Sequence, residues 1–423
     1  MAKMNKWLYP GIRIKRWVFL FILSIIVIIA GFSGFIGSLF SHIRFEAFNI
    51  DWIFYRLQQL KALDYLLLLL GVGGIILAAR RAYFSVLTIF MPNREKDFIN
   101  MAYRKAKLKR GPKVAAIGGG TGMPNVLRGM KRYTSNLSAV VTVADDGGSS
   151  GRLRKDYQIL PPGDIRNCIV ALADEEALLG RLFKYRFEKG DDLSGHNFGN
   201  IFLTALTHVV GDFPMAINES SKVLAIQGEV LPVSLDNIQL RAKLKDGREI
   251  HGESNIPQSG GVIEKVFIEP ADCKPYVHAV EAIKKADVVV IGPGSLYTSI
   301  MPNLLVPGIR EALEGSKQLR IYICNIMTQP GETDGFTVSD HVKAIIDHAG
   351  GRVIDYVVAN NVLPGEQLLT RYAGEGAYPV RVDRDRLHLL GVKLIEGQLF
   401  DEGEFIRHSP QRLARILMKN MIV

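Results

Sequence analysis

The sequence predicts a doubly wound, Rossmann-like α/β domain that carries an antiparallel β insertion and follows an N-terminal transmembrane helical hairpin. Three observations lead to this prediction. Short apolar runs rich in β-branched residues alternate with helix-like stretches from residue 113 onward, as in a parallel sheet that is covered on both faces. The first of these runs leads into a glycine-rich loop, and two long apolar stretches precede the whole region.

The two apolar stretches near the N-terminus predict membrane spans. Residues 17–40, WVFLFILSIIVIIAGFSGFIGSLF, contain no charged side chain, and a helix needs roughly 20 apolar residues to cross a bilayer. Residues 63–79, LDYLLLLLGVGGIILAA, contain one charged residue and end at Arg80 and Arg81. We therefore expect a membrane hairpin within residues 1–90. A buried or interfacial helix is the alternative for the second run, and a cleaved signal peptide is disfavoured because two runs follow each other.

Basic residues flanking the two runs predict the orientation of the hairpin. The loop between the runs holds only Arg44, Arg56 and Lys61. The outer flanks hold many more Lys and Arg residues: Lys3, Lys6, Arg13, Lys15, Arg16, Arg80, Arg81, Arg94, Lys96, Arg104, Lys105, Lys107, Lys109 and Arg110. Because cytoplasmic flanks carry the excess of Lys and Arg, both ends should be cytoplasmic. The chain should therefore sit in the cell membrane with its main domain in the cytoplasm. Residues 91–112 then form a basic juxtamembrane linker, which either lies against anionic lipid or is a solvated tether.

Composition excludes several classes of function. The 423 residues have a net charge of +10, but much of this charge flanks the apolar runs, so nucleic acid is not an expected partner. The three cysteines, Cys168, Cys273 and Cys324, are far apart and form no CxxC pair. This spacing suits a reducing compartment and argues against a disulfide or zinc framework.

The cytoplasmic domain is expected over residues 113–423. Its predicted strands are residues 114–118, 138–144, 286–292, 321–327 and 354–360, and its predicted helices include residues 124–131, 198–210, 277–285 and 340–348. Residues 223–269 depart from this alternation and read as several short strands. Within them, QLRAKLKDGREIHGE alternates around Asp246-Gly247, which is a strong hairpin signal.

The first candidate for a ligand site is the loop GGGTG, which follows a strand and precedes a helix. Its residues are Gly118, Gly119, Gly120, Thr121 and Gly122. Glycines let backbone N–H groups approach a phosphate, and the helix N-terminus adds partial positive charge. The chain has Met123 where the dinucleotide fingerprint has its third glycine, and no GKS or GKT follows, so an ATPase P-loop is excluded. A tight turn without a ligand is the alternative.

The second candidate loop, VADDGGSSGRLR, ends the second predicted strand. Asp145 or Asp146 could bond a ribose hydroxyl or hold Mg²⁺ through one or two oxygens, and Asp146 is a tentative catalytic residue. Further contacts to a phosphate-bearing ligand are expected from Gly148, Ser149, Ser150 and Arg152. The alternative is an Asp-Gly turn with solvated charges.

Two further motifs combine polar side chains with helix starts. In LPPGDIRNCIVAL, Asp164 is a natural N-cap, and Arg166 and Asn167 could face the ligand. In LSGHNFGNIFLTAL, the side chains of His196, Asn197 and Asn200 cluster where a helix begins. Both motifs allow a purely structural interpretation as well as contacts to a sugar, base or phosphate.

The last two motifs follow later strands and should reach the same edge of the sheet. IGPGSLYTS offers Gly292, Gly294, Ser295, Tyr297 and Thr298. Tyr297 could stack on a base, or it could be a buried tyrosine. NIMTQPGETDGFTVSDH adds Thr328, Gln329, Glu332 and Asp334.

Together these motifs resemble the gluconeogenesis factor family of bacteria, which is similar in fold to 2-phospho-L-lactate transferase. The resemblance runs from about residue 113 to the C-terminus and leaves out the hairpin, so the chain resembles a membrane-tethered variant. It implies binding of a UDP-sugar, notably UDP-N-acetylglucosamine, and a role in cell shape and peptidoglycan precursor supply during gluconeogenic growth. The transferase relatives use Mg²⁺, which makes Asp145 or Asp146 a tentative metal-linked carboxylate.

Three hypotheses about function follow. The favoured one is a UDP-sugar-binding regulatory protein, with a wall-precursor enzyme as its partner and a homo-oligomeric state. The alternative is a Mg-dependent nucleotidyl or phosphoryl-group transferase acting on a sugar phosphate, because such chemistry needs mainly positioning and charge neutralisation. A nicotinamide oxidoreductase is the least favoured, since Met123 breaks the fingerprint.

Overall fold

The computed structural model describes residues 14–40, 61–90, 103–174, 177–190, 192–315, 318–401 and 403–421. The chain divides into two compact units, Met1–Arg104 and Lys105–Val423, which are described separately. Most of the predicted linker and the loop between the two predicted spans lie outside the described residues.

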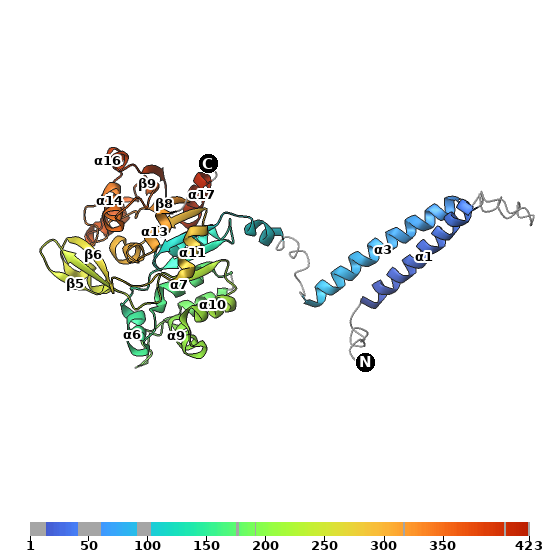
Figure 1. The fold of residues 1–423 in the computed structure, drawn as a ribbon, viewed down its shortest axis with the longest axis horizontal. Coiled ribbons are helices and arrows are strands. Elements are labelled where there is room, and N and C mark those ends of the chain that lie inside the picture. The colour runs from blue at the N-terminus through green and yellow to red at the C-terminus, as the bar shows by residue number, and fades with distance from the viewer. Residues whose placement is uncertain are drawn as a thin grey trace, which may run out of the picture. The chain divides into compact units, whose positions relative to one another are not determined.

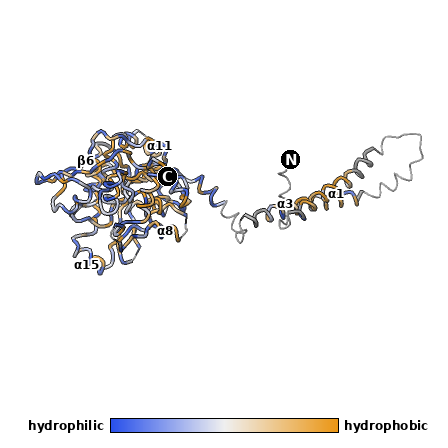
Figure 2. Tube along the Cα trace, turned by 90° about the horizontal axis from the view of Figure 1, so that it is seen from below, coloured by the Kyte–Doolittle hydropathy of each residue, from blue (hydrophilic) through white to orange (hydrophobic). Residues whose placement is uncertain are grey.

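The N-terminal unit contains two long helices, α1 (Ile14–Phe40) and α3 (Lys61–Phe90), which pack against each other (Figure 1). They meet along small side chains. Ser24 and Ala78 are buried, and a Cβ atom on Gly74 would overlap the Ser24 hydroxyl. Large apolar side chains point outward, with Phe19 69% and Leu69 73% exposed, and hydrophobic residues predominate in the coloured stretch of the helix pair (Figure 2).

The two helices differ in how well they satisfy the requirements for a span. Leu63–Ser85 in α3 is long and apolar enough to cross a membrane, whereas the described apolar stretch of α1, Arg16–Phe32, is shorter. The predicted hairpin therefore has structural support as a helix pair, while its insertion in a membrane remains a prediction.

The second unit is built on a seven-stranded sheet with the order β10-β9-β8-β7-β1-β2-β3, and every neighbouring pair is parallel. Its strands are β1 (Val114–Gly118), β2 (Leu137–Val141), β3 (Glu229–Pro232), β7 (Val288–Ile291), β8 (Leu319–Ile323), β9 (Tyr356–Asn360) and β10 (Lys393–Gly397). The central strands are buried along their length, with β1 and β7 covered on both faces. This burial is why they read as continuous apolar runs.

Helices connect and cover the strands. They are α5 (Met123–Met130), α6 (Gly148–Tyr157), α7 (Pro162–Leu172), α8 (Ala177–Lys184), α9 (Phe198–Val210), α10 (Phe213–Val223), α11 (Val277–Lys285), α12 (Met301–Leu304), α13 (Ile309–Glu314), α14 (Val338–Ala349), α15 (Glu366–Gly374), α16 (Arg384–Leu389) and α17 (Pro410–Met421). The predicted doubly wound α/β class is confirmed for this unit. Helices α9 and α11 have the predicted bounds.

A separate three-stranded antiparallel sheet with the order β5-β4-β6 forms the insertion. It consists of β4 (Gln239–Leu244), β5 (Glu249–His251) and β6 (Ile263–Glu269). The predicted hairpin turn joins β4 to β5, where Gly247 has φ +90° and the Arg248 N–H donates to Asp246 Oδ1 at 3.0 Å. The insertion is smaller than predicted, because residues 229–232 pair with β2 as the edge strand of the main sheet.

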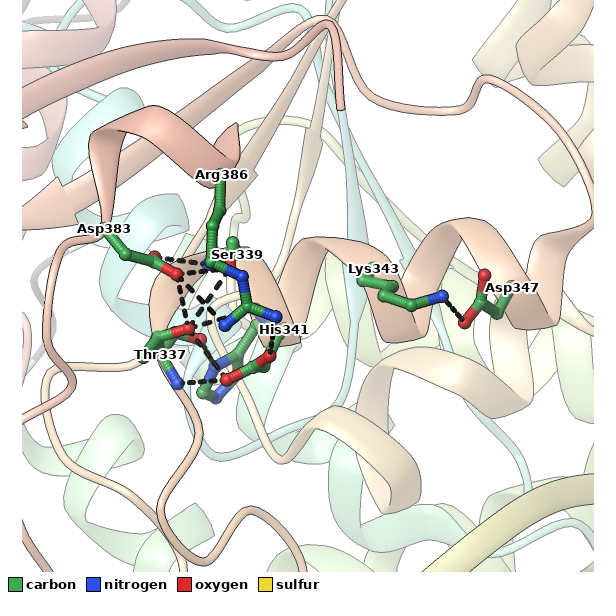
Figure 3. Close-up of polar contacts among 8 residues, drawn as sticks. Thr337, Ser339, His341, Lys343, Asp347, Asp383 and Arg386 are labelled. Carbon is green, nitrogen blue, oxygen red and sulfur yellow. Dashed lines mark hydrogen bonds and ion pairs between the residues drawn. The ribbon is translucent and has the colours of Figure 1, made fainter. Parts of the chain in front are cut away.

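A polar network fixes the start of α14 (Figure 3). Asp383 accepts hydrogen bonds from the Ser339 hydroxyl, from the Ser339 N–H at 3.0 Å and from the Thr337 hydroxyl at 2.8 Å. Partial burial opposes ionisation, but these three bonds, that of the Ser339 hydroxyl first, hold the pKa of the Asp383 carboxyl below its usual range. Arg386 of α16 also pairs with Asp340, at 3.2 Å. Because Asp383 directly precedes α16, the network joins α16 to the N-terminus of α14.

Candidate functional site

The strand order places the switch point of the sheet between β1 and β7. From β1 the chain proceeds through β2 to β3 on one side, and from β7 through β8 and β9 to β10 on the other. Loops at the carboxyl ends of these two strands diverge and leave a crevice, which is where open α/β sheets bind ligands. The predicted glycine loop follows β1, and the predicted IGPGSLYTS loop follows β7.

A cavity of about 360 Å³ opens at this crevice. The β1 and β7 loops supply Thr121, Gly122, Pro293, Gly294 and Ser295 to its wall. The remaining lining comes from the start of α5, the β8 loop, α15 with the residues after it, and a segment before α17: Asn125, Asn325, Ile326, Met327, Thr328, Gln329, Pro330, Tyr372, Glu375, Ala377, Ile406, Arg407 and His408. Amide, hydroxyl and cationic groups, the Glu375 carboxylate and apolar side chains therefore surround the space.

The glycine loop packs closely against two segments, the start of α7 at Asp164 and the β7 loop at Pro293. A Cβ atom on Gly120 would overlap Asp164, and one on Gly122 would overlap the Pro293 carbonyl group. The backbone N–H of Gly120 donates to the Asp164 carboxyl, whose burial nevertheless raises its pKa to about 7. Asp164 is the third residue of α7, after the N-cap Pro161, so it contacts the loop instead of capping its own helix. Gly118 and Gly119 lie deeper, beside Met123 and Ser299 respectively.

The two aspartates of the second loop have different environments. Asp145 Oδ1 accepts the Gly147 N–H at 3.0 Å, and burial raises the pKa of its carboxyl. Both oxygens of Asp146 are engaged by the insertion: they accept the N–H groups of Glu253 at 3.0 Å and Ser254 at 2.9 Å.

This pair does not fit a ready-made magnesium site. Asp146 already uses both oxygens as hydrogen-bond acceptors. Among the residues that the structure describes, no three His, Cys, Asp or Glu side chains are grouped as metal ligands.

Ser149 is the centre of a buried network between α6 and α9. Its Oγ accepts the Asn197 N–H at 3.3 Å and the Asn200 amide at 3.2 Å, and it lies 3.1 Å from His196 Nδ1. Because the oxygen accepts two hydrogen bonds, its own hydrogen is directed to Nδ1, which assigns the neutral imidazole proton to Nε2. Burial, and then Arg152, lower the pKa of His196. All three predicted residues of the SGHNFGN motif are thus brought to the start of α6, which begins at Gly148.

Arg166 extends this network toward α7. Its guanidinium donates to Asn200 at 3.0 Å and to Asn167 at 2.7 Å. Burial lowers its pKa to about 10, and its Nε has no hydrogen-bond partner among the described residues. Asn167 therefore orients Arg166. Arg152 is more exposed and donates to the Ser194 carbonyl at 2.9 Å.

The β7 loop divides into a part that lines the cavity and a part that is buried. Gln329 donates to the Ser295 hydroxyl at 2.8 Å, and both residues line the cavity. Gly292 begins this loop with φ +77°. Beyond Ser295 the chain forms a π-helical turn, η4 (Leu296–Ile300), a rare geometry that is frequent at functional sites.

Tyr297 and Thr298 lie within this turn and face the core. Tyr297 is 3% exposed, and its ring packs edge-on against Phe336 and His348. Thr298 donates to Glu332 Oε1 at 3.1 Å, and the Tyr297 N–H donates to Oε2 at 3.2 Å. The buried-tyrosine interpretation therefore describes Tyr297 in this structure, and Glu332 caps the turn.

Sequence reasoning missed one part of the site and one carboxyl beside the predicted loops. Arg407 and His408 line the cavity from the segment before α17, far from every motif. Glu253 comes from the insertion and does not line the cavity, and its pKa is raised to about 8 by burial and then by the carboxylates of Asp145 and Asp164. No local pattern marks either segment, because only the tertiary fold brings Arg407 and His408 to the cavity and Glu253 near Asp145 and Asp164.

The chain is similar to known proteins over most of its length. Residues 114–400 match the family described as 2-phospho-L-lactate transferase CofD. Gluconeogenesis factor of Bacillus subtilis is 46% identical over 308 residues, which cover 73% of this chain and 97% of that protein. The chain belongs to the gluconeogenesis factor family. The resemblance seen in the motifs is thereby confirmed.

Other relatives in the gluconeogenesis factor family extend this finding. A Nostoc relative is 45% identical over 427 residues, which cover 98% of this chain and 92% of that protein. Its alignment therefore includes most of the N-terminal unit, whereas the Bacillus subtilis alignment covers 73% of the chain. The crystal structure of a Bacillus halodurans protein superposes with a TM-score of 0.71 at 48% identity and covers 73% of this chain and 99% of that chain.

Proposed function

We propose that the chain is a UDP-sugar-binding regulatory protein, with UDP-N-acetylglucosamine as its ligand. The observation that carries this proposal is the cavity at the switch point between β1 and β7, which glycine loops, amide side chains and Arg407 line together with apolar side chains. Backbone N–H groups and a guanidinium suit a diphosphate, and the amide side chains of Asn125, Asn325 and Gln329 suit a base or sugar. Because the relatives are named gluconeogenesis factors, we infer a role in growth on gluconeogenic carbon, where the protein would support cell shape and peptidoglycan precursor supply.

Calorimetric titration of UDP-N-acetylglucosamine into the full chain in detergent tests this proposal. Saturable binding that Arg407→Ala weakens by about tenfold or more is expected, because a guanidinium–phosphate contact is charge-assisted. Arg132→Ala, which removes a cation outside the lining of the cavity, serves as the matched control. If no uridine nucleotide binds, the proposal is wrong.

A transferase is the second candidate, and the match to the 2-phospho-L-lactate transferase family favours it. Incubation with UTP, a sugar 1-phosphate and Mg²⁺ would release pyrophosphate if the protein is a nucleotidyltransferase. Binding of the nucleotide sugar without turnover supports the regulatory function. Because Asp146 is engaged by the insertion, Asp145→Asn is the sharper test of a metal-linked carboxylate.

We further propose that the helix pair α1–α3 anchors the protein in the cell membrane with the main domain in the cytoplasm. The outward apolar side chains and the small residues between the helices support this arrangement, since helices in lipid pack closely through small residues. A cytoplasm-specific reporter enzyme fused after Val423 should be active. Activity of a periplasm-specific reporter fused at the same position would contradict the topology.

A wall-precursor enzyme as partner and a homo-oligomeric state remain part of the proposal, to be tested by co-purification and light scattering.

A further inference from the structure

Phe405 is an exposed aromatic residue in the segment that leads into α17. Its side chain is 56% exposed, and the three residues that follow it, Ile406, Arg407 and His408, line the cavity. A single exposed apolar side chain is common at a protein surface and needs no explanation. What distinguishes Phe405 is the pair of guanidinium groups that lie against its ring.

These guanidinium groups belong to Arg371 of α15 and to Arg407. The Cζ atom of Arg371 lies 5.0 Å from the centroid of the Phe405 ring, and the Cζ atom of Arg407 lies 5.4 Å from it. Both distances fall within the range of a cation–π interaction, in which the face of the ring attracts the cation. The ion pairs between described residues involve neither arginine, so both positive charges are available to an anion.

The backbone on both sides of Arg407 is anchored. The Tyr372 hydroxyl accepts the Ile406 N–H at 3.1 Å. His408 Nε2 lies 3.1 Å from the Cys324 carbonyl oxygen, to which it donates, because a carbonyl can only accept. Arg407 therefore begins at a fixed place in the wall of the cavity. These bonds do not set the direction of its long side chain.

The Phe405 ring is the group that restrains this side chain. An arginine has many rotamers, so ordering it on a bound anion costs conformational entropy, and a contact that orders it beforehand reduces this cost. A planar guanidinium that stacks on a ring keeps the N–H groups at its edge free to donate hydrogen bonds. The ring can thus hold Arg407 without competing with a phosphate for its N–H groups.

We propose that Phe405 is a positioning residue that holds the Arg407 guanidinium at the cavity wall for the diphosphate of the bound nucleotide sugar. This inference rests on the proposed function. It gives the exposed ring a role in affinity that requires no contact between the ring and the ligand. Arg371, which lies over the same ring, connects this arrangement to α15.

A double-mutant cycle with a conservative rescue tests the positioning role. UDP-N-acetylglucosamine is titrated into the full chain in detergent for the wild type, Phe405→Leu, Phe405→Tyr, Arg407→Ala and the double variant Phe405→Leu with Arg407→Ala. Phe405→Leu should weaken binding about threefold to fivefold, which corresponds to one exposed cation–π contact. Phe405→Tyr keeps the aromatic face and should bind like the wild type. In the Arg407→Ala background, Phe405→Leu should cause no further loss, because the cation is already gone.

Three results of this titration would overturn the inference: no loss in Phe405→Leu, an equal loss in Phe405→Tyr, or additive losses in the double variant. Tyr133→Leu is the matched control. It removes an exposed aromatic ring that does not line the cavity, and it should bind like the wild type.

Chemical modification of arginine separates this inference from the proposed function. The full chain is treated with phenylglyoxal in the absence of nucleotide, and the modified peptides are quantified by mass spectrometry. Arg407 should react at least about threefold faster in Phe405→Leu than in the wild type or in Tyr133→Leu, because the ring no longer covers it. An unchanged rate would show that Phe405 does not hold Arg407. If the wild type binds no nucleotide sugar while the rate responds as expected, the proposed function and the role of Phe405 in affinity are both wrong, and only the contact between the two residues stands.

Discussion

Gly122 lies so close to Pro293 that a Cβ atom on Gly122 would overlap the Pro293 carbonyl oxygen. This contact joins the loop after β1 to the loop after β7 at the switch point of the sheet. Both residues also line the cavity. The glycine is therefore needed to bring the two walls of the site together, whatever its N–H group binds.

Gly122→Ala should destabilise the domain and weaken ligand binding. Forcing a methyl group against a backbone carbonyl costs about 1–3 kcal/mol, measured as a lower urea midpoint for residues 105–423. Gly180→Ala is the matched control, because nothing lies within 4 Å of its Cβ position in α8. That change should stabilise the helix by about 0.5–1 kcal/mol. Equal midpoints for the two variants would contradict the close contact.

Asp164 should make the free energy of unfolding depend on pH. Burial raises its pKa to about 7 in the folded domain, from 3.8. Between these values the folded state holds a proton that the unfolded state has lost, so stability falls as pH rises from about 4 to 7 and then levels off. The slope approaches about 1.4 kcal/mol per pH unit for one proton.

The check on this prediction is urea denaturation of Asp164→Asn between pH 4 and 8. The variant is neutral at this position throughout, so its slope should be smaller than that of the wild type by up to about 1.4 kcal/mol per pH unit, while the raised pKa values of Glu253 and Asp145 leave the remainder. Asp156→Asn, at an exposed position, should keep the slope. A wild-type slope that persists in Asp164→Asn would assign the effect to another carboxyl, such as Glu253.

The central sheet was predictable because its strands are buried on both faces, so β1 and β7 appear as unbroken apolar runs. Edge strands β3 and β10 were not predicted. Residues 229–232 are few and include Pro232, and residues 393–397 are only half buried. The loops at the candidate site were predictable from their place after strands. The directions of their side chains were not predictable. Tyr297 packs against Phe336 in the core, and Asp146 accepts hydrogen bonds from the insertion. Both contacts depend on the tertiary fold.

Glu332 should stabilise the π-helical turn that follows the cavity loop. Its carboxylate accepts hydrogen bonds from the Tyr297 N–H and the Thr298 hydroxyl while 6% exposed. Glu332→Ala leaves these donors buried without an acceptor, which costs about 1–3 kcal/mol for each group. The urea midpoint should fall, and Ser295 should lose its position at the cavity.

Thr298→Val distinguishes a capping role from a general effect of charge. It removes one donor but keeps the shape of the side chain, so a smaller loss of about 1 kcal/mol is expected. In the Glu332→Ala background the same change should cost less, because its acceptor is already gone. Glu366→Ala, at an exposed position, controls for the loss of a carboxylate. Independent, additive losses would argue against the cap.

The hairpin allows a test with adjacent glycines. A Cβ atom on Gly74 would overlap the Ser24 hydroxyl of α1, whereas nothing lies within 4 Å of a Cβ atom on Gly73. Gly74→Val should therefore separate α1 from α3, and Gly73→Val should place its side chain among the outward apolar residues at no cost. The temperature at which the detergent-solubilised full chain aggregates should fall for Gly74→Val only. Since both variants add the same apolar group to the same helix, an equal response would show that hydrophobicity, and not close helix packing, determines the stability of this unit.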